Sequence, residues 1–231
     1  MTSGGHADAI AAACRRLHAR GLLAGAEGNV SVLLANGDLL ITRTGVDKAT
    51  MSGADVVTMH AGGSVHHDRG ADHSPRDVTG RDITTRPSSE VGMHRACYAA
   101  RGDVRAVVHA HPPVASGFAT AGVGLPADVL PELPVVVGPV ALVPYGRPGT
   151  PALELAMAPF LAAHEAFLLA NHGVTTLGST LDDALLRMES VEQAARIILV
   201  ARLLGGEQRL DREEAFELAA RRVAPPLVWR E

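Results

Sequence analysis

Apolar residues recur every three to four positions in several stretches of the chain, which is the spacing of an amphipathic helix. Gly21 follows the first of these stretches and Gly205-Gly206 follows the longest, so both are expected to end helices. Thr150 and Thr180 precede two others at N-cap positions. Helices are therefore predicted at about 8–20, 90–101, 113–122, 151–164, 181–204 and 212–224.

Shorter apolar runs bounded by glycine, asparagine or proline predict strands. Asn36-Gly37 lies between two of them, at 30–35 and 38–42, and predicts a hairpin with a type I′ turn, whose two central residues both take positive φ. Hairpins with interspersed helices predict a mixed α/β layer fold around a mainly antiparallel sheet. A strand at 56–59 and the Gly62-Gly63 turn after it predict another strand pair. Further strands are expected at 104–108, 134–137, 141–143, 167–169 and 174–177.

No apolar period runs through residues 65–87, which are rich in Asp, Arg, His and Thr. Solvated histidines on a polar loop are several times commoner than a metal site in such a segment. We therefore interpret it as an exposed loop or flap that carries His66, His67 and His73, rather than as a second metal site.

The composition limits both the size of the fold and the class of partner. With 231 residues, 47% of them hydrophobic, the chain can bury a substantial core, and we expect one domain over 1–231. A net charge of −4 without a basic stripe and an aromatic content of 3% argue against nucleic acid. Cys14 and Cys97 are too few for a disulfide framework, and neither a signal segment nor a membrane-spanning apolar run is present. We expect a cytoplasmic protein with small-molecule or protein partners and no membrane.

The candidate chemistry begins at two histidines that follow a predicted strand. His109 and His111 come at the end of the apolar run 104–108, and Pro112-Pro113 end regular pairing directly after them. Side chains at i and i+2 of a strand share a face, so the two imidazoles can converge on one ion. Two polar residues that merely close a strand would look the same, and the pair alone leaves both interpretations open.

A third imidazole is offered by His172, in a tight connection between the strands 167–169 and 174–177. Gly173 is expected to supply the positive φ that such a connection needs. Three histidines leave an open coordination position, which is typical of a catalytic rather than a structural zinc site.

The helix before the histidine pair opens with further polar residues. Glu90 in its first turn either complements the helix dipole or faces the metal. His94, one turn later, either supports this site or is polar surface. Ser88 and Ser89 at the helix start can bind a phosphate, although a plain N-cap would use only one of them.

Two small polar loops are also candidates for anion binding. Gly28-Asn29 precedes the first hairpin and Thr44-Gly45 follows it, so the hairpin brings them to the same end. Their backbone N–H groups can surround an anion, but ordinary turn residues would look much the same.

Together these motifs resemble the class II aldolase/adducin family, and most closely its L-fuculose-phosphate aldolase branch. The likeness covers about residues 7–205 and leaves a C-terminal helix and tail at 206–231. It implies a single three-layer α/β domain in which helices cover both faces of a central, mainly antiparallel sheet. The motifs that carry the resemblance are Gly28-Asn29-Val30-Ser31, Thr42-Arg43-Thr44-Gly45, Pro87-Ser88-Ser89-Glu90, His109-Ala110-His111-Pro112 and Asn171-His172-Gly173.

The resemblance also implies the roles of these residues. One Zn²⁺ per subunit, or Mn²⁺ or Co²⁺ in its place, would be held by three histidines, and Glu90 would be the catalytic base or a fourth ligand. The subunits would assemble as a ring-like homotetramer with active sites between them. The metal ligands would be His109, His111 and His172, and the residues around the substrate phosphate would be Gly28, Asn29, Thr44, Gly45, Ser88 and Ser89.

The implied activity is that of a zinc-dependent aldolase. It would reversibly cleave a fuculose-phosphate-like or 5-deoxyketose 1-phosphate to dihydroxyacetone phosphate and an aldehyde. Breaking a carbon–carbon bond beside a ketone leaves an enediolate, which needs either an imine or a metal. The single lysine, Lys48, falls in a polar loop, so the imine route has almost no candidate.

Other activities share the same metal site. A sugar-phosphate dehydratase or decarboxylase of the family is poorly separated from an aldolase by sequence, whereas an epimerase would be expected to carry Asp at position 90. A non-enzymatic, adducin-like interaction module would not need the three histidines and Glu90.

Three positions depart from the family pattern. Leu130 stands where the aldolases offer a tyrosine from a neighbouring subunit to the aldehyde oxygen, and Glu132 is a stand-in acid for it. The 62–86 loop is longer than its counterpart, and the tail supplies Trp229 in place of an aromatic hydroxyl. The sugar phosphate, its stereochemistry and the native metal are therefore left open.

Overall fold

The computed structural model describes residues 3–61, 65–66 and 86–221. The Gly62-Gly63 turn, the segment 67–85 and Trp229 lie outside these residues, and so does most of the predicted polar loop. Residues 65–66, predicted as the start of that loop, form a short strand after the turn.

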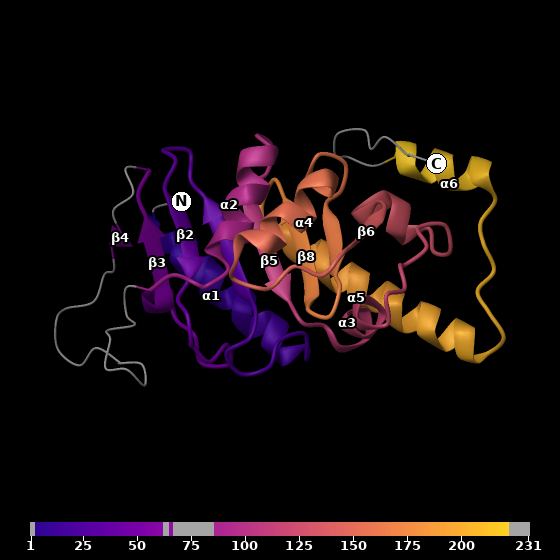
Figure 1. Ribbon diagram of the computed structural model, residues 1–231, viewed down its shortest axis with the longest axis horizontal. Coiled ribbons are helices and arrows are strands. Elements are labelled where there is room, and N and C mark those ends of the chain that lie inside the picture. The colour runs from indigo at the N-terminus through magenta and orange to yellow at the C-terminus, as the bar shows by residue number, and fades with distance from the viewer. Residues whose placement is uncertain (1–2, 62–64, 67–85, 222–231) are drawn as a thin grey trace.

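Eight strands form one sheet in the described part of the chain. They are β1 (Asn29–Leu33), β2 (Leu39–Thr42), β3 (Val56–Met59), β4 (Val65–His66), β5 (Ala106–Ala110), β6 (Val140–Val143), β7 (Ala166–Leu169) and β8 (Gly173–Gly178). Their order is β4-β3-β2-β1-β5-β8-β7-β6, and all neighbours are antiparallel except β6 and β7 (Figure 1). The predicted mainly antiparallel sheet is confirmed, with β5 in its interior.

Helices cover both faces of this sheet. They are α1 (Ser3–Ala19), α2 (Val91–Ala100), α3 (Pro113–Thr120), α4 (Pro151–Leu161), α5 (Leu181–Leu203) and α6 (Arg212–Ala220). One apolar core contains buried residues of α1, α3 and α5, and a second contains those of α2 and α4. The alternation of side chains along a strand separates the two cores: Val108 joins the first and Val107 the second. This gives the expected three-layer α/β arrangement.

Two predicted elements differ from the structure. The first helix begins at Ser3 rather than near residue 8. Residues 134–137, predicted as a strand, lie in a short π-helical turn, η2 (Leu133–Val137). Periodicity cannot separate a short apolar run in a strand from one in a helix. Here Pro134 has no N–H to give to a neighbouring strand, and Gly138 ends the turn with a φ of 77°.

The β1–β2 hairpin is present, but its turn is not of type I′. Gly37 takes a φ of 85°, whereas Asn36 does not adopt positive φ. The N–H of Gly37 donates to the carbonyl of Leu34 at 3.0 Å, and the N–H of Leu34 donates to the carbonyl of Asp38 at 2.8 Å. A single left-handed glycine after an ordinary turn thus closes a three-residue connection.

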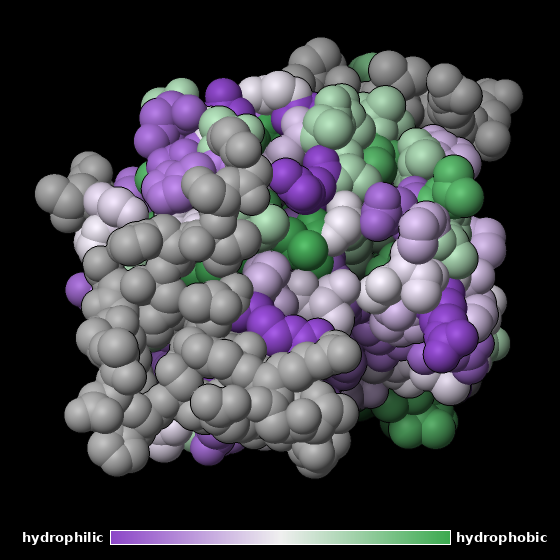
Figure 2. All heavy atoms as spheres, turned by 60° about the vertical axis from the view of Figure 1, so that its left-hand side comes forward, coloured by the Kyte–Doolittle hydropathy of each residue, from purple (hydrophilic) through white to green (hydrophobic). Residues whose placement is uncertain are grey.

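The surface adds little to the assignment of a partner. On the face that Figure 2 shows, hydrophilic and hydrophobic residues are interspersed. None of the helices in the described ranges has the length and apolar character needed to cross a bilayer.

Candidate active site

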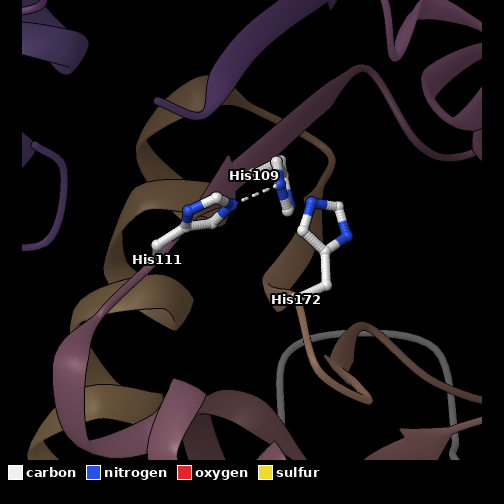
Figure 3. Close-up of side chains that lie close together, drawn as sticks. All are labelled: His109, His111 and His172. Atoms are coloured by element: carbon white, nitrogen blue, oxygen red, sulfur yellow. Dashed lines mark hydrogen bonds between the residues drawn. The ribbon is translucent and has the colours of Figure 1, made fainter. Parts of the chain in front are cut away.

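Three histidines from two parts of the chain lie together beside β5. His109 is in β5, His111 directly follows it, and His172 lies in the connection between β7 and β8 (Figure 3). One ring nitrogen from each lies within 4.8 Å of the others, and the Nε2 atoms of His109 and His111 are 3.1 Å apart. The structure therefore brings together all three imidazoles predicted to hold a metal.

The pairing of β5 with β8 explains this convergence. His109 is opposite Thr175 and Ala110 is opposite Val174, so the β7–β8 connection lies beside the residue that follows β5. Nδ1 of His109 lies 3.0 Å from both the carbonyl oxygen of Val174 and the hydroxyl oxygen of Thr175. A carbonyl can only accept, so Nδ1 carries the proton and Nε2 presents its lone pair to the other rings.

The β7–β8 connection is built differently from the prediction. Asn171, not Gly173, takes the positive φ, at 55°, and it is the one non-glycine residue in the described ranges to do so. Asparagine tolerates this conformation better than most residues. Gly173 is needed for space instead, because a Cβ there would lie 2.5 Å from Cδ2 of His111 and 2.6 Å from the carbonyl oxygen of Ala110.

Glu90 faces the histidines from the residue directly before α2. Its Oε2 lies 3.4 Å from Nε2 of His109 and accepts a hydrogen bond from Nδ2 of Asn29 at 2.8 Å. Its Oε1 lies 3.3 Å from Nε2 of His172 and has no hydrogen-bond partner. Burial raises the pKa of Glu90, and the bond from Asn29 partly offsets this. Of the two alternatives for Glu90, the structure favours the one in which it faces the histidine cluster.

The chemistry of this donor set fits a divalent transition metal. Burial and the neighbouring imidazoles lower the pKa of His109 well below its usual range, and burial lowers that of His172 to about 4. The rings of His109 and His172 are therefore neutral near pH 7, as metal ligands must be. The buried Nδ1 of His172 and Oε1 of Glu90 have no hydrogen-bond partner. Three imidazole nitrogens and one carboxylate oxygen are ligands that Zn²⁺, Mn²⁺ and Co²⁺ accept.

A pocket opens beside the histidines and contains every residue predicted to surround a phosphate. The hairpin brings its two polar loops to the same end, as expected, and the start of α2 lies beside them. The lining residues are Ala26, Glu27, Gly28, Asn29, Arg43, Thr44, Gly45, Ser88, Ser89, Glu90, His111, Pro148 and His172.

These predicted phosphate residues are not equally free to bind a ligand. Ser88 is buried, and its hydroxyl accepts from the N–H of Glu90 at 3.3 Å, a local contact in the turn before α2. Ser89 is exposed. Asn29 is buried, and its side chain is already bonded to Glu90 and to His94. Gly28 has a φ of 65° and lets the loop pass close to β5, since a Cβ there would lie 2.6 Å from the carbonyl oxygen of His109.

Sequence reasoning missed two charged residues of the pocket. Oε2 of Glu27 lies 3.3 Å from Nδ1 of His111, and Glu27 directly precedes the recognised Gly28. Arg43 lies within the recognised 42–45 motif and pairs with Oδ1 of Asp55 at 2.9 Å. Only their positions inside or beside a recognised motif could have indicated these residues. Their contacts, with His111 and Asp55, come from other segments of the chain.

Lys48 lies in a loop, as predicted, but its side chain is buried rather than solvated. It is 1% exposed, and its Nζ donates to the carbonyls of Val46 at 3.0 Å and Ala26 at 3.2 Å. Burial lowers the pKa of Lys48. The lysine joins the two polar loops and does not line the pocket, so the imine route still lacks a candidate among the described residues.

Leu130 and Glu132 do not reach this pocket within one chain. Leu130 lines a different hollow with Ile197 and Ile198 of α5, and Glu132 is exposed. The position predicted to supply an acid therefore lies on another surface of the molecule.

Comparison with known proteins places this geometry in context. The chain is 33% identical over 185 residues to 3-oxo-tetronate 4-phosphate decarboxylase from Escherichia coli (strain K12), covering 78% of this chain and 80% of that protein. It is 30% identical over 185 residues to L-fuculose phosphate aldolase from Methanococcus maripaludis, covering 80% and 91%. The crystal structure of YgbL from Escherichia coli superposes with a TM-score of 0.81 at 28% identity, covering 95% and 100%.

The family match covers most of the chain. Residues 8–199 match the family described as the Class II Aldolase and Adducin N-terminal domain. The matched range contains the three histidines, Glu90 and both polar loops. The chain therefore belongs to the class II aldolase and adducin family.

Proposed function

We propose that this protein is a metal-dependent aldolase that reversibly cleaves a ketose 1-phosphate to dihydroxyacetone phosphate and an aldehyde. One observation carries the proposal: three imidazoles and the Glu90 carboxylate converge at one end of a pocket that is lined mostly by polar and charged residues. The fuculose-phosphate and 5-deoxyketose 1-phosphate classes both fit this scheme.

The metal would be held by His109, His111 and His172. When bound, it supplies positive charge beside the substrate carbonyl oxygen, which favours charge build-up on that oxygen as the carbon–carbon bond breaks. Zn²⁺ is the expected ion, with Mn²⁺ or Co²⁺ as alternatives. The hydrogen bonds from Nδ1 of His109 keep that ring fixed before any substrate arrives.

Glu90 is the residue proposed to move the proton. In cleavage the substrate hydroxyl becomes the aldehyde carbonyl and loses a proton, while the carbon left behind gains one. Glu90 would deliver the proton to that carbon and remove it in the reverse reaction. Burial raises the pKa of Glu90, so this carboxylate takes up a proton more readily than an exposed one.

The phosphate would lie at the polar end of the pocket. Ser89 is exposed, Thr44 and Gly45 follow the hairpin, and all three line the same space. Gly28, Asn29 and Ser88 would contribute mainly by shaping this end, because their side chains are absent or already bonded.

The proposal is tested by proton exchange at the dihydroxyacetone phosphate carbon in deuterated water. The assay needs no aldehyde, so it does not depend on the unassigned acid. Glu90→Gln should keep the metal and lose roughly 100-fold or more in exchange rate, because the amide cannot act as a base. Wild-type exchange with an unchanged rate in Glu90→Gln would remove Glu90 from the mechanism.

A second candidate function is decarboxylation of a 3-oxo sugar-acid phosphate, as in the relative from Escherichia coli. One observation favours it: Leu130, whose side chain has no acidic group, stands where the aldolases offer a tyrosine to the aldehyde oxygen. Release of CO₂ involves no hydroxyl that must lose a proton, so it needs one acid–base group fewer than aldol cleavage. CO₂ release from 3-oxo-tetronate 4-phosphate, without condensation of dihydroxyacetone phosphate with any aldehyde, would select this candidate.

A further inference from the structure

A continuous row of polar side chains runs away from Glu90 through the layer between α2 and β1. Nδ2 of Asn29 contacts Glu90 at 2.8 Å, and Oδ1 of Asn29 lies 2.5 Å from Nε2 of His94. Nδ1 of His94 lies 2.6 Å from the hydroxyl of Ser31, which lies 2.7 Å from the hydroxyl of Tyr98. Asn29 is 3% exposed, and His94 and Ser31 are fully buried.

The spacing of the two elements explains the row. Glu90, His94 and Tyr98 are four residues apart along one side of α2, and four helical residues rise about 6 Å. Asn29 and Ser31 are two residues apart on one face of β1, and two strand residues span about 6.7 Å. Because these repeats nearly match, the side chains of the helix and the strand interleave in order.

The direction of every hydrogen bond follows from the carboxylate. An ionised Glu90 can only accept, so the Asn29 amide donates to it and presents Oδ1 to His94. Nε2 of His94 must therefore carry a proton. Burial lowers the pKa of His94 to about 3, so the ring is neutral and its Nδ1 accepts from Ser31. Burial raises the pKa of Tyr98, whose hydroxyl keeps its proton and donates to Ser31.

We propose that His94 is a positioning residue for Glu90. Its Nε2–H fixes the orientation of the Asn29 amide, which in turn holds Oε2 of Glu90 and leaves Oε1 directed at His172. Four hydrogen bonds that all donate toward the carboxylate polarise one another in a buried setting. The part of this proposal that concerns catalysis rests on the proposed function of Glu90, whereas the arrangement of hydrogen bonds does not.

The first test measures the arrangement without any activity. Nitrogen-15 NMR of the Zn²⁺-loaded, histidine-labelled protein should show one ring protonated at Nε2, bare at Nδ1 and unchanged from pH 6 to 8. That signal should be missing from the spectrum of His94→Gln. A His94 ring protonated at Nδ1, or at both nitrogens, would overturn the proposal.

The second test measures exchange of the dihydroxyacetone phosphate proton in four proteins: wild type, His94→Phe, Glu90→Gln and the double variant. His94→Phe removes both ring nitrogens and should cost roughly 10- to 100-fold, the scale found for residues that orient a ligand or a base. It should add no further loss in the Glu90→Gln background, because Asn29 then no longer orients a base. An equal loss in both backgrounds, or none in wild type, would contradict the proposal.

Two further variants separate positioning from folding. His94→Gln keeps one donor and one acceptor, so it should recover part of the exchange rate that His94→Phe loses. Thr176→Val removes a different buried hydrogen bond, from Thr176 to the carbonyl of Ala184 at 2.7 Å, and should lower stability without lowering exchange. If wild-type protein shows no exchange, the proposed function fails, and the NMR result alone decides the arrangement around His94.

Discussion

At the scale of single residues, burial keeps the imidazoles of His94, His109 and His172 neutral. His109 and His94 are fully buried, and both have pKa values far below that of a free histidine. His172 is less buried, and its pKa falls to about 4. A neutral ring can bind a cation or take part in a chain of hydrogen bonds, so the same physical effect prepares His109 and His172 for the proposed metal and His94 for its proposed positioning role.

Removing any one of the three clustered imidazoles should abolish metal binding. Wild-type protein is expected to hold about one divalent ion per chain, because the three histidines form one cluster that can surround a single ion. Metal content after dialysis, measured by mass spectrometry, should drop to background in His109→Ala, His111→Ala and His172→Ala. His164→Ala is the matched control, since that ring bonds to the carbonyl of Phe160. Full occupancy in all three variants would contradict the site.

The neutral His94 also predicts how stability depends on pH. The pKa of His94 is about 3 in the folded protein and 6.5 in the unfolded chain, so the unfolded chain binds the proton more tightly. The contribution of this histidine is therefore complete above pH 6.5 and is lost as the pH falls toward 3. Between pH 7 and pH 4 the free energy of unfolding should fall by about 3 kcal/mol more in wild type than in His94→Gln. Parallel urea titrations at the two pH values give this difference, and equal pH slopes would refute it.

Residue type and local spacing were enough to predict that three imidazoles and Glu90 converge. His109 and His111 share a strand face, and His172 and Glu90 lie at element ends, where side chains reach a common space. Glu27 was not predicted, because nothing in its neighbourhood signals that it reaches His111. The burial of His94 was left open for the same reason: it depends on β1, which is more than 60 residues away in sequence.

At the scale of elements, the site depends on how closely β8 approaches the end of β5. Gly173→Ala would place a methyl group against His111 and the backbone of Ala110. We expect a loss of stability of about 1–3 kcal/mol from overpacking and a metal affinity roughly 10- to 100-fold weaker. Chelator competition and chemical denaturation measure the two effects.

Gly102→Ala is the control for this substitution, because a Cβ at Gly102 would meet no atom within 4 Å. It should leave metal affinity unchanged. Equal affinities in Gly173→Ala and wild type would show that the close approach is not needed for the site.

The predicted elements were correct where both ends carried a signal. Thr180 accepts a hydrogen bond from the N–H of Asp183 at the start of α5, as its N-cap position predicts. Residues 134–137 contain Pro134 and precede Gly138, but their three successive valines suit a strand and a buried turn equally. Their true conformation is set by packing against α5 and α6, which the sequence of the segment does not contain.

At the scale of the whole molecule, apolar side chains remain exposed at one end. Figure 1 shows the C-terminal end of α5 extending beyond the sheet. Leu203 and Leu204 there are 78% and 83% exposed, and Phe216 of α6 is 65% exposed. Leu130 borders the neighbouring hollow. Burial of such groups between subunits would stabilise an assembly, because apolar area removed from water contributes about 25 cal/mol per Å².

We therefore predict a homo-oligomer, with the tetramer implied by the family resemblance as the expected form. Light scattering of the wild-type protein should give a mass of about four chains. Leu203→Glu combined with Leu204→Glu should shift it toward smaller species, because two buried carboxylates would be left unpaired. Asp182→Ala, on the other end of α5, is the control. A fully active monomer would contradict the prediction.

The position of β5 between β1 and β8 also sets the order in which the protein can mature. His109 is paired with Asn29 on one side and with Thr175 on the other, so both contacts span long stretches of chain. Such distant pairings form slowly. During synthesis His109 and His111 emerge well before His172, and two imidazoles hold an ion weakly. Ion capture should therefore follow closure of β8 onto β5, as the last step rather than the nucleus of folding. A chelator present during refolding should leave the rate of sheet formation unchanged and delay only the appearance of activity.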